Sequence, residues 1–166
     1  MLPKVLCVVG PTASGKTKLS ILLAERYNGE VVSIDSMQIY RGMSIGTAAP
    51  TAAEMGRVPH HMVAVAEPGD NWSAARFTAA AGDCIQDILE RNKLPVLAGG
   101  TGLYLEAVVS GRTFAPGASG GAVRLELELE LEAGGIEPLL AQLRAVDPAA
   151  AGRLHPADTK RILRAL

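Results

Sequence analysis

The sequence has no apolar run long enough to cross a membrane, although 48% of its 166 residues are hydrophobic. Its first residues, Met1-Leu-Pro-Lys4, lead directly into a short apolar run without the pattern of a signal peptide. We therefore expect a cytoplasmic protein that has no membrane partner. The length and composition suffice for one buried core and are typical of a single α/β domain.

The sequence contains only two cysteines and three histidines. We expect Cys7, in the first apolar run, and Cys84, in a helical pattern, to be buried free thiols rather than a disulfide or metal ligands. His60 and His61 have no cysteine or carboxylate nearby at a spacing suited to zinc. Structural or substrate-contact roles are therefore favoured over a metal site.

The segment Gly10–Thr17 matches the phosphate-binding pattern of Gly, four residues, Gly, Lys and Thr. It stands between the apolar run Val5–Val9 and a helical pattern, which is the context that a P-loop requires. Its glycines allow a tight bend that directs backbone N–H groups at oxyanions, Lys16 supplies a cation, and the Thr17 hydroxyl suits magnesium. The predicted diphosphate-binding or nucleotide-binding residues are Gly10, Pro11, Thr12, Ala13, Ser14, Gly15, Lys16 and Thr17, with Thr17 also a metal ligand.

Asp35 follows the mostly apolar segment Val31–Ile34, which is predicted to be a buried strand. Open parallel sheets bind ligands at the carboxyl ends of their strands, so Asp35 is expected to face the P-loop. Three roles are open to this carboxylate: it could hold magnesium through water, accept a proton from a nucleophile, or only cap the turn at Ser36. The P-loop alone does not identify its ligand, because the same geometry binds a nucleoside triphosphate or another diphosphate.

Further motifs occur in one order along nearly the whole chain. They are Gly10–Thr17, Asp35–Thr47, Pro59–His61, Ser73–Phe77, Leu94–Tyr104, Asp147–Pro148, and His155–Asp158 followed by Arg161. In these motifs the sequence resembles the tRNA dimethylallyltransferases, which attach a five-carbon prenyl group to the exocyclic amine of an adenine beside the anticodon. The chain departs from the family pattern at Ala49, Ala157 and Arg76, where Lys, Asn and often an acid are usual. These departures concern contacts with tRNA rather than the class of reaction.

The resemblance implies a P-loop, three-layer α/β/α fold with a parallel sheet, followed by the start of a helical insertion domain. It implies tRNA and dimethylallyl diphosphate as substrates and magnesium as the cofactor, and we expect the full-length form to be a monomer. The implied catalytic residues are Lys16, Asp35 as general base, and Thr101. The implied tRNA contacts are Asp35, Ser36, Met37, Gln38, Thr101, Thr159, Lys160, Arg161, Ile162 and Leu163.

The chemistry of such a transfer agrees with the motifs. An aromatic amine is a poor nucleophile, so the reaction is easiest when the leaving diphosphate is strongly stabilised, and P-loop amides, Lys16 and magnesium would provide that stabilisation. The turn Gly99–Gly102 lies at the same sheet edge, where Thr101 could donate a hydrogen bond to the adenine or to a phosphate oxygen. A plain strand-to-helix turn is the alternative for this segment.

The hydrophobic pattern predicts the order of the elements. They are strand Val5–Val9, helix Lys16–Tyr27, strand Val31–Ile34, a long loop to about Val65, helix Ser73–Asn92 with Ser73 as N-cap, strand Pro95–Ala98, helix Leu103–Ser110, helix Ile136–Val146 and a helix starting near Thr159. The run Leu125–Glu132 alternates with a period of two, which favours a strand. Both of its residue types favour helices and the family has a helix here, so we predict a helix.

The domain boundary is predicted from composition. Residues 1–112 are expected to form the P-loop core domain with an incomplete sheet, and residues 113–166 a linker and a helical, tRNA-contacting insertion. The segment from Thr113 to Gly121 is rich in Gly, Ala, Ser and Pro, which is typical of a linker.

The net charge of −1 is low for a protein that binds RNA phosphates. Five basic or titratable residues nevertheless gather near the end of the chain: Arg153, His155, Lys160, Arg161 and Arg164. The resemblance implies that this segment touches the tRNA backbone. A solvated helix face that contacts nothing is the other interpretation.

The helical pattern near the end of the sequence extends to Leu166 without a terminating Gly, Pro or cap. We therefore expect the chain to be the N-terminal portion of a longer protein and to be inactive alone. Two other functions stay open: prenyl transfer to a free adenine nucleotide, as in cytokinin synthesis, and a small-molecule P-loop kinase or non-catalytic phosphate-binding remnant. Prenyl transfer to a free adenine nucleotide would not need the segment after Thr113. A kinase would turn over ATP with an acceptor.

Overall fold

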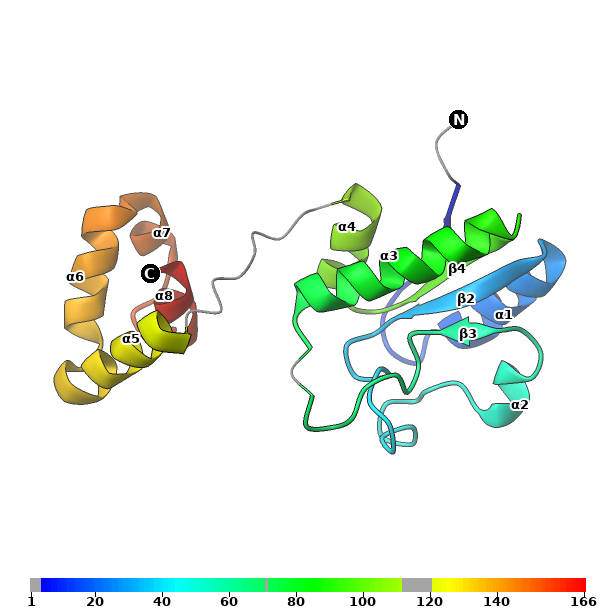
Figure 1. The fold of residues 1–166 in the computed structure, drawn as a ribbon, viewed down its shortest axis with the longest axis horizontal. Helices are drawn as coiled ribbons and strands as arrows, with labels where there is room; N and C mark the ends of the chain where they lie inside the picture. Colours follow the sequence, from blue (N-terminus) through cyan, green and yellow to red (C-terminus); the bar gives the residue numbers. More distant parts are fainter. Residues whose placement is uncertain (1–3, 71, 112–120) are drawn as a thin grey trace. The chain divides into compact units, whose positions relative to one another are not determined.

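The computed structural model describes residues 4–70, 72–111 and 121–166. The chain divides into two compact units, Met1–Phe114 and Ala115–Leu166. The first unit combines strands and helices, and the second is helical (Figure 1). The linker predicted from Thr113 to Gly121 lies outside the described residues except for Gly121, where a helix begins.

The first unit is built on a parallel sheet with the strand order β1-β4-β2-β3. Its strands are β1 Leu6–Val9, β2 Gly29–Ile34, β3 His60–His61 and β4 Leu94–Gly99, and its helices are α1 Lys16–Arg26, α2 Ala52–Met55, α3 Ala74–Glu90 and α4 Gly102–Ser110. Parallel strands need crossover connections, and α1 and α3 provide them between β1 and β2 and between β3 and β4. The predicted α/β class with a parallel sheet is confirmed.

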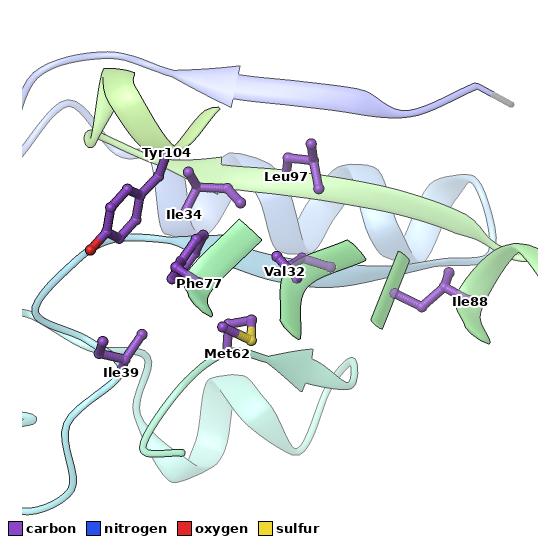
Figure 2. Packing of buried hydrophobic residues seen from close by; sticks show 9 residues of the cluster. Val32, Ile34, Ile39, Met62, Phe77, Ile88, Leu97 and Tyr104 are labelled. Atoms are coloured by element: carbon purple, nitrogen blue, oxygen red, sulfur yellow. The ribbon is translucent and has the colours of Figure 1, made fainter. Parts of the chain in front are cut away.

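Successive residues of β2 face two different cores, one on each side of the sheet. Val31 packs against α1, whereas Val32 and Ile34 pack against α3, where Phe77 and Ile88 are fully buried (Figure 2). A strand that is covered on both faces is buried at every position, which explains why apolar residues of β2 stand next to each other instead of alternating with exposed ones. Its two polar residues, Glu30 and Ser33, are buried as well and have hydrogen-bond partners. The sheet therefore lies between two helical layers, as the three-layer prediction requires.

The segment predicted to be a long loop up to Val65 contains two short elements. A capping box begins α2: Glu54 N–H donates to Thr51 Oγ1 over 3.3 Å, and Thr51 N–H donates to the Glu54 carboxylate over 2.8 Å. β3 joins the sheet next to β2, where Val31 N–H donates to the Pro59 carbonyl over 2.9 Å. Two residues are too few for a strand period to be recognised in a sequence.

Both cysteines are free thiols, as predicted, but their exposure differs. Cys84 is half-buried on α3. Cys7 is exposed because β1 is an edge strand, and the buried Val8 next to it points to the other face. The prediction that Cys7 is buried is therefore wrong.

The second unit consists of α5 Gly121–Gly134, α6 Ile136–Val146, α7 Pro148–Arg153 and α8 Thr159–Ala165. Its core contains Leu127 of α5, Leu139 and Leu143 of α6, and Ile162 of α8. The Leu-Glu run is helical, as predicted, because both residues are strong helix formers and the Leu127 side of α5 packs against α6.

The short helix α7 is not among the predicted elements. It begins after Asp147, whose carboxylate accepts a hydrogen bond from Ala150 N–H over 2.8 Å, and Pro148 occupies its first turn. No helix in the described part of the chain is both long and apolar enough to cross a membrane.

Candidate phosphate-binding and active site

A cavity of about 700 Å³ opens at the carboxyl ends of the strands in the first unit. Its wall includes P-loop residues from Thr12 to Thr17, the turn residues Asp35, Met37 and Gln38, and Gly99 and Gly100 at the end of β4. Segments far apart in the sequence thus meet at the edge where parallel sheets bind ligands. Asp35 and the P-loop residues thus line one cavity.

The P-loop has the backbone geometry of an anion cradle. Ala13 and Gly15 have positive φ angles of 63° and 81°, and Gly15 is the N-cap of α1. This arrangement turns successive N–H groups toward one side, next to the positive end of the α1 dipole. The Lys16 ammonium donates to the Pro11 carbonyl over 2.6 Å, so its charge is held across the loop. The cradle therefore presents hydrogen-bond donors and one cation.

Two strand ends approach each other closely beside this cradle. A Cβ atom on Gly99 would stand only 2.0 Å from the carbonyl oxygen of Ile34, so only glycine permits this packing. The approach brings the turn after β4 against the turn after β2: Ser36 N–H donates to Thr101 Oγ1 over 3.2 Å, and Thr101 N–H donates to Ile34 O over 3.3 Å. Thr101 thus joins the two turns through hydrogen bonds with the residues that precede and follow Asp35.

Asp35 caps its own turn. Its Oδ1 accepts hydrogen bonds from Met37 N–H over 2.9 Å and from Gln38 N–H over 3.3 Å. These bonds fix the direction of the carboxylate at the cavity wall. The capping role is therefore observed, and it is compatible with either chemical role because a carboxylate has a second oxygen.

Gln38 connects this turn to the loop that forms another wall of the cavity. Its Oε1 accepts from Ser33 Oγ over 2.8 Å, and its Nε2 donates to the carbonyls of Thr47 and Ala48 over 3.3 Å each. The side chain of Gln38 is therefore engaged within the protein. Sequence reasoning placed Gln38 at the site but did not reveal this positioning role.

The adjacent histidines have different surroundings. His60 lines the cavity. His61 instead lies 2.7 Å from the carboxylate of Glu30, a buried residue that also pairs with Arg91 and Lys93. Sequence reasoning missed these partners because they are 30 or more positions away from Glu30 along the chain.

The predicted tRNA-contacting residues of α8 belong to the second unit. Lys160 and Arg161 are exposed, and Thr159 and Leu163 are half-buried. Ile162 is fully buried in the core of this unit. Its side chain is therefore not available to tRNA, and a contact by this segment would come from its exposed neighbours.

Comparison with known proteins identifies the family. The family model described as IPP transferase matches residues 38–166, and one described as isopentenyl transferase matches residues 3–62. A tRNA dimethylallyltransferase of Halorhodospira halophila is 51% identical over 166 residues, which are 100% of this chain and 53% of that protein. One of Anaeromyxobacter sp. (strain Fw109-5) is 52% identical over 163 residues, 98% of this chain and 54% of that protein.

Solved structures agree with these relatives. The full-length tRNA isopentenylpyrophosphate transferase of Bacillus halodurans shows 46% identity and a TM-score of 0.66, with 98% of this chain and 54% of that chain covered. A eukaryotic dimethylallyltransferase acting on tRNA shows 32% identity and a TM-score of 0.84, with 98% and 40% covered. The chain spans about half the length of the curated relatives it matches. Because the first family model covers well over half of the sequence, the chain belongs to the IPP transferase family.

Proposed function

We propose that the chain is the N-terminal portion of a tRNA dimethylallyltransferase. The reaction would transfer the dimethylallyl group of dimethylallyl diphosphate to the exocyclic amine of an adenine next to the anticodon. The observation that carries this proposal is the shared cavity, in which a donor-lined P-loop and the Asp35 carboxylate face the same space. The relatives named above, which align with nearly the whole chain, support the same activity.

The P-loop end of the cavity suits the leaving group. As the bond between carbon and oxygen breaks, negative charge grows on the diphosphate, and the P-loop amides and the Lys16 ammonium would stabilise it without rearranging. Lys16 is already held across the loop by the Pro11 carbonyl. A fixed cation of this kind lowers the barrier because the cost of orienting it is met during folding.

Magnesium fits the oxygen donors at this end. The Thr17 hydroxyl and the Asp35 carboxylate both line the cavity. The described residues contain no group of three or more His, Cys, Asp or Glu that could hold a metal ion. Magnesium does not require such a group, because it is commonly held by one or two protein oxygens together with substrate phosphates. When bound, it would neutralise part of the diphosphate charge.

Asp35 would accept the proton that the amine loses on transfer. Its Oδ1 is held by two backbone N–H groups, so the carboxylate keeps one orientation at the cavity wall. A positioned general base of this kind contributes about a hundred- to ten-thousand-fold in rate. Thr101 would position this turn through its bond to Ser36 N–H, and its own hydroxyl hydrogen remains available for the adenine or a phosphate oxygen.

The second unit would contribute to binding of the tRNA backbone. Lys160, Arg161 and Arg164 are exposed on or near α8, and exposed cations supply most of the affinity for RNA phosphates. Asp158, the N-cap of α8, lies 3.3 Å from Arg161 and moderates its charge. A cytoplasmic location follows from a tRNA substrate, and the monomeric state of the full-length form stays a prediction.

A free adenine nucleotide is the second candidate acceptor, because the isopentenyl transferase family model matches residues 3–62. The test uses radiolabelled dimethylallyl diphosphate with unmodified tRNA, AMP and ATP as competing acceptors, for this chain and for a full-length form. We expect label on tRNA with the full-length form only. Label on AMP would favour the second candidate, and ATP turnover without prenyl transfer would refute both and favour a kinase.

Binding can be tested with this chain alone. Lys16→Ala removes one charge-assisted contact, worth about 1.5 to 3 kcal/mol, and should weaken binding of dimethylallyl diphosphate by about 10- to 150-fold. Calorimetry measures the affinity, and Lys4→Ala, which removes an exposed lysine that is not among the residues lining the cavity, is the control. An unchanged affinity for the folded Lys16→Ala protein would contradict the assignment of the P-loop as the diphosphate site.

A further inference from the structure

The guanidinium group of Arg76 lies over the indole ring of Trp72, with its Cζ atom 4.5 Å from the centroid of the ring. A cation at this distance is attracted by the π-electrons of the ring, so the arginine side chain has a preferred position. Trp72 packs against the core on the α3 side of the sheet, and its indole nitrogen is buried. The ring is therefore anchored to the protein and holds the cation in the first turn of α3.

The charge of Arg76 has no partner in the part of the chain that the structure describes. Arg76 is exposed, and its guanidinium makes no hydrogen bond or ion pair with the described residues. Three other arginines of the first unit are paired with carboxylates: Arg41 with Glu67, Arg57 with Glu25, and Arg91 with Glu30. Because the ring of Trp72 contacts only the face of the guanidinium, the N–H donors along its edge remain free to bind an anion.

The Trp72–Arg76 pair lies at the edge of the sheet at which the cavity opens. α3 crosses from β3 to the parallel strand β4, so it begins at the carboxyl ends of the strands (Figure 1). The Tyr40 hydroxyl, which follows the Asp35 turn, donates to the carbonyl of Asp70 over 3.3 Å. This bond ties the chain just before Trp72 to the segment that carries Asp35.

An anion bound by Arg76 would lie outside the cavity. Arg76 is not among the residues that line it, and Trp72 packs on the α3 side of the sheet, whereas the P-loop leads into α1 on the other side. A diphosphate in the P-loop would therefore be bound by other groups. A tRNA offers a second source of phosphate, because a nucleotide whose base enters the cavity is joined to backbone phosphates on both sides.

We propose that Arg76, positioned by Trp72, binds a backbone phosphate of the acceptor RNA outside the cavity. The edge of a guanidinium presents parallel N–H donors that match two oxygens of one phosphate. The ring already restricts the side chain, so less conformational freedom is lost on binding. The choice of RNA as the partner rests on the proposed function, whereas the positioned and unpaired cation does not.

The test measures binding of unmodified tRNA to the full-length form, by filter binding from about 50 to about 200 mM salt. Arg76→Gln removes the cation and keeps a polar side chain. We expect the affinity to fall by about three- to tenfold at low salt. The loss of one phosphate contact should also reduce the slope of log affinity against log salt by about 0.7.

Arg26→Gln is the matched control, because it changes the net charge by the same amount. Arg26 is also exposed, but it lies in the last turn of α1, next to the beginning of β2 and thus at the opposite edge of the sheet. Its substitution should leave the affinity for tRNA within about twofold of wild type. Equal losses in Arg26→Gln and Arg76→Gln would overturn the proposal, because the effect would then be one of overall charge.

Variants of Trp72 test the positioning role. Trp72→Leu keeps the charge of Arg76 but removes the ring, and should weaken tRNA binding by about two- to threefold, whereas Trp72→Phe should restore part of the loss. In the Arg76→Gln background, Trp72→Leu should have no further effect, because the ring acts through the guanidinium. The same loss in both backgrounds would show that Trp72 is only structural and would contradict the positioning role.

Two measurements separate this proposal from the proposed function. Calorimetry should show that Arg76→Gln binds dimethylallyl diphosphate as wild type does, and a weaker affinity there would assign the cation to the diphosphate instead of RNA. Equal tRNA affinities and salt slopes for wild type and Arg76→Gln would overturn the phosphate contact and leave the proposed function intact. Absence of tRNA binding by the wild-type full-length form would refute both.

Discussion

Replacing Glu30 with Gln should destabilise the first unit strongly, although Glu30 is not among the described residues that line the cavity. Glu30 is 1% exposed, and its carboxylate lies 2.7 Å from Lys93 Nζ and 2.7 Å from His61 Nε2, with Arg91 bound to both oxygens. Glu30→Gln keeps the shape but leaves Lys93 without its counter-ion and leaves Arg91 with only the exposed Asp87 carboxylate. Breaking a buried ion pair costs about 3 to 5 kcal/mol, and the partial exposure of Arg91 and Lys93 favours the lower end.

A loss of about 3 kcal/mol lowers the melting temperature of a domain of this size by roughly 10 °C. Thermal unfolding followed by circular dichroism measures it. The matched control is Glu25→Gln, which breaks the exposed pair with Arg57 and should have a much smaller effect. A melting temperature within about 2 °C of wild type for Glu30→Gln would refute the reasoning, because the cluster would then contribute nothing to stability.

The same cluster predicts a pH dependence. Hydrogen bonds from Arg91, and then from Lys93 and His61, hold the pKa of Glu30 well below its usual range and outweigh the opposing effect of burial. A carboxylate with a depressed folded pKa contributes its full stability above the unfolded pKa and loses it as the pH falls toward the folded one. The difference in stability between wild type and Glu30→Gln should therefore shrink below about pH 4.3. A difference that is constant from pH 7 to pH 3 would contradict this linkage.

Three further substitutions test the site and the second unit. In a full-length form, Asp35→Asn should reduce turnover by a hundredfold or more with little change in diphosphate binding, measured by single-turnover kinetics and calorimetry. Thr101→Val should cost about 1 to 2 kcal/mol in denaturant unfolding, because Ser36 N–H loses its acceptor, and Thr101→Ser should restore it. Leu127→Ala should cost about 2 to 4 kcal/mol, whereas Leu129→Ala on the exposed side of α5 should cost less than about 0.5 kcal/mol.

The sequence predicted the first unit well because its patterns carry local physical causes. The adjacent apolar residues Val31 and Val32 of β2 indicate a strand covered on both faces, and Ser73 is the observed N-cap of α3, where Arg76 N–H donates to its hydroxyl over 3.1 Å. Boundaries shifted by one or two residues, as at β2, which begins at Gly29 instead of Val31. A Cβ atom on Gly29 would stand 2.5 Å from the Leu94 carbonyl oxygen, so the close approach of β4 explains the earlier start.

In α5 the helix propensity of leucine and glutamate outweighs a hydrophobic pattern with a period of two, which by itself would favour a strand. Leucine at every second position would suit a strand with one buried face. In the helix the same spacing spreads leucines around the axis, so Leu127 reaches the core while Leu125 and Leu129 stay exposed. Helix propensity summed over the run decides the structure, and packing against α6 uses only one side of it.

The roles of polar side chains were harder to predict than the positions of the motifs, because a role depends on which lone pairs and hydrogens are already engaged. Gln38 was predicted as a contact for tRNA, yet its amide is bonded to Ser33 and to two loop carbonyls. His60 and His61 are identical in sequence terms, but parallel strand pairing sends one toward the cavity and the other toward Glu30, a partner 31 positions away. Residue type and spacing therefore locate a P-loop site. The hydrogen bonds within the folded chain determine which atoms of that site remain free to bind a ligand.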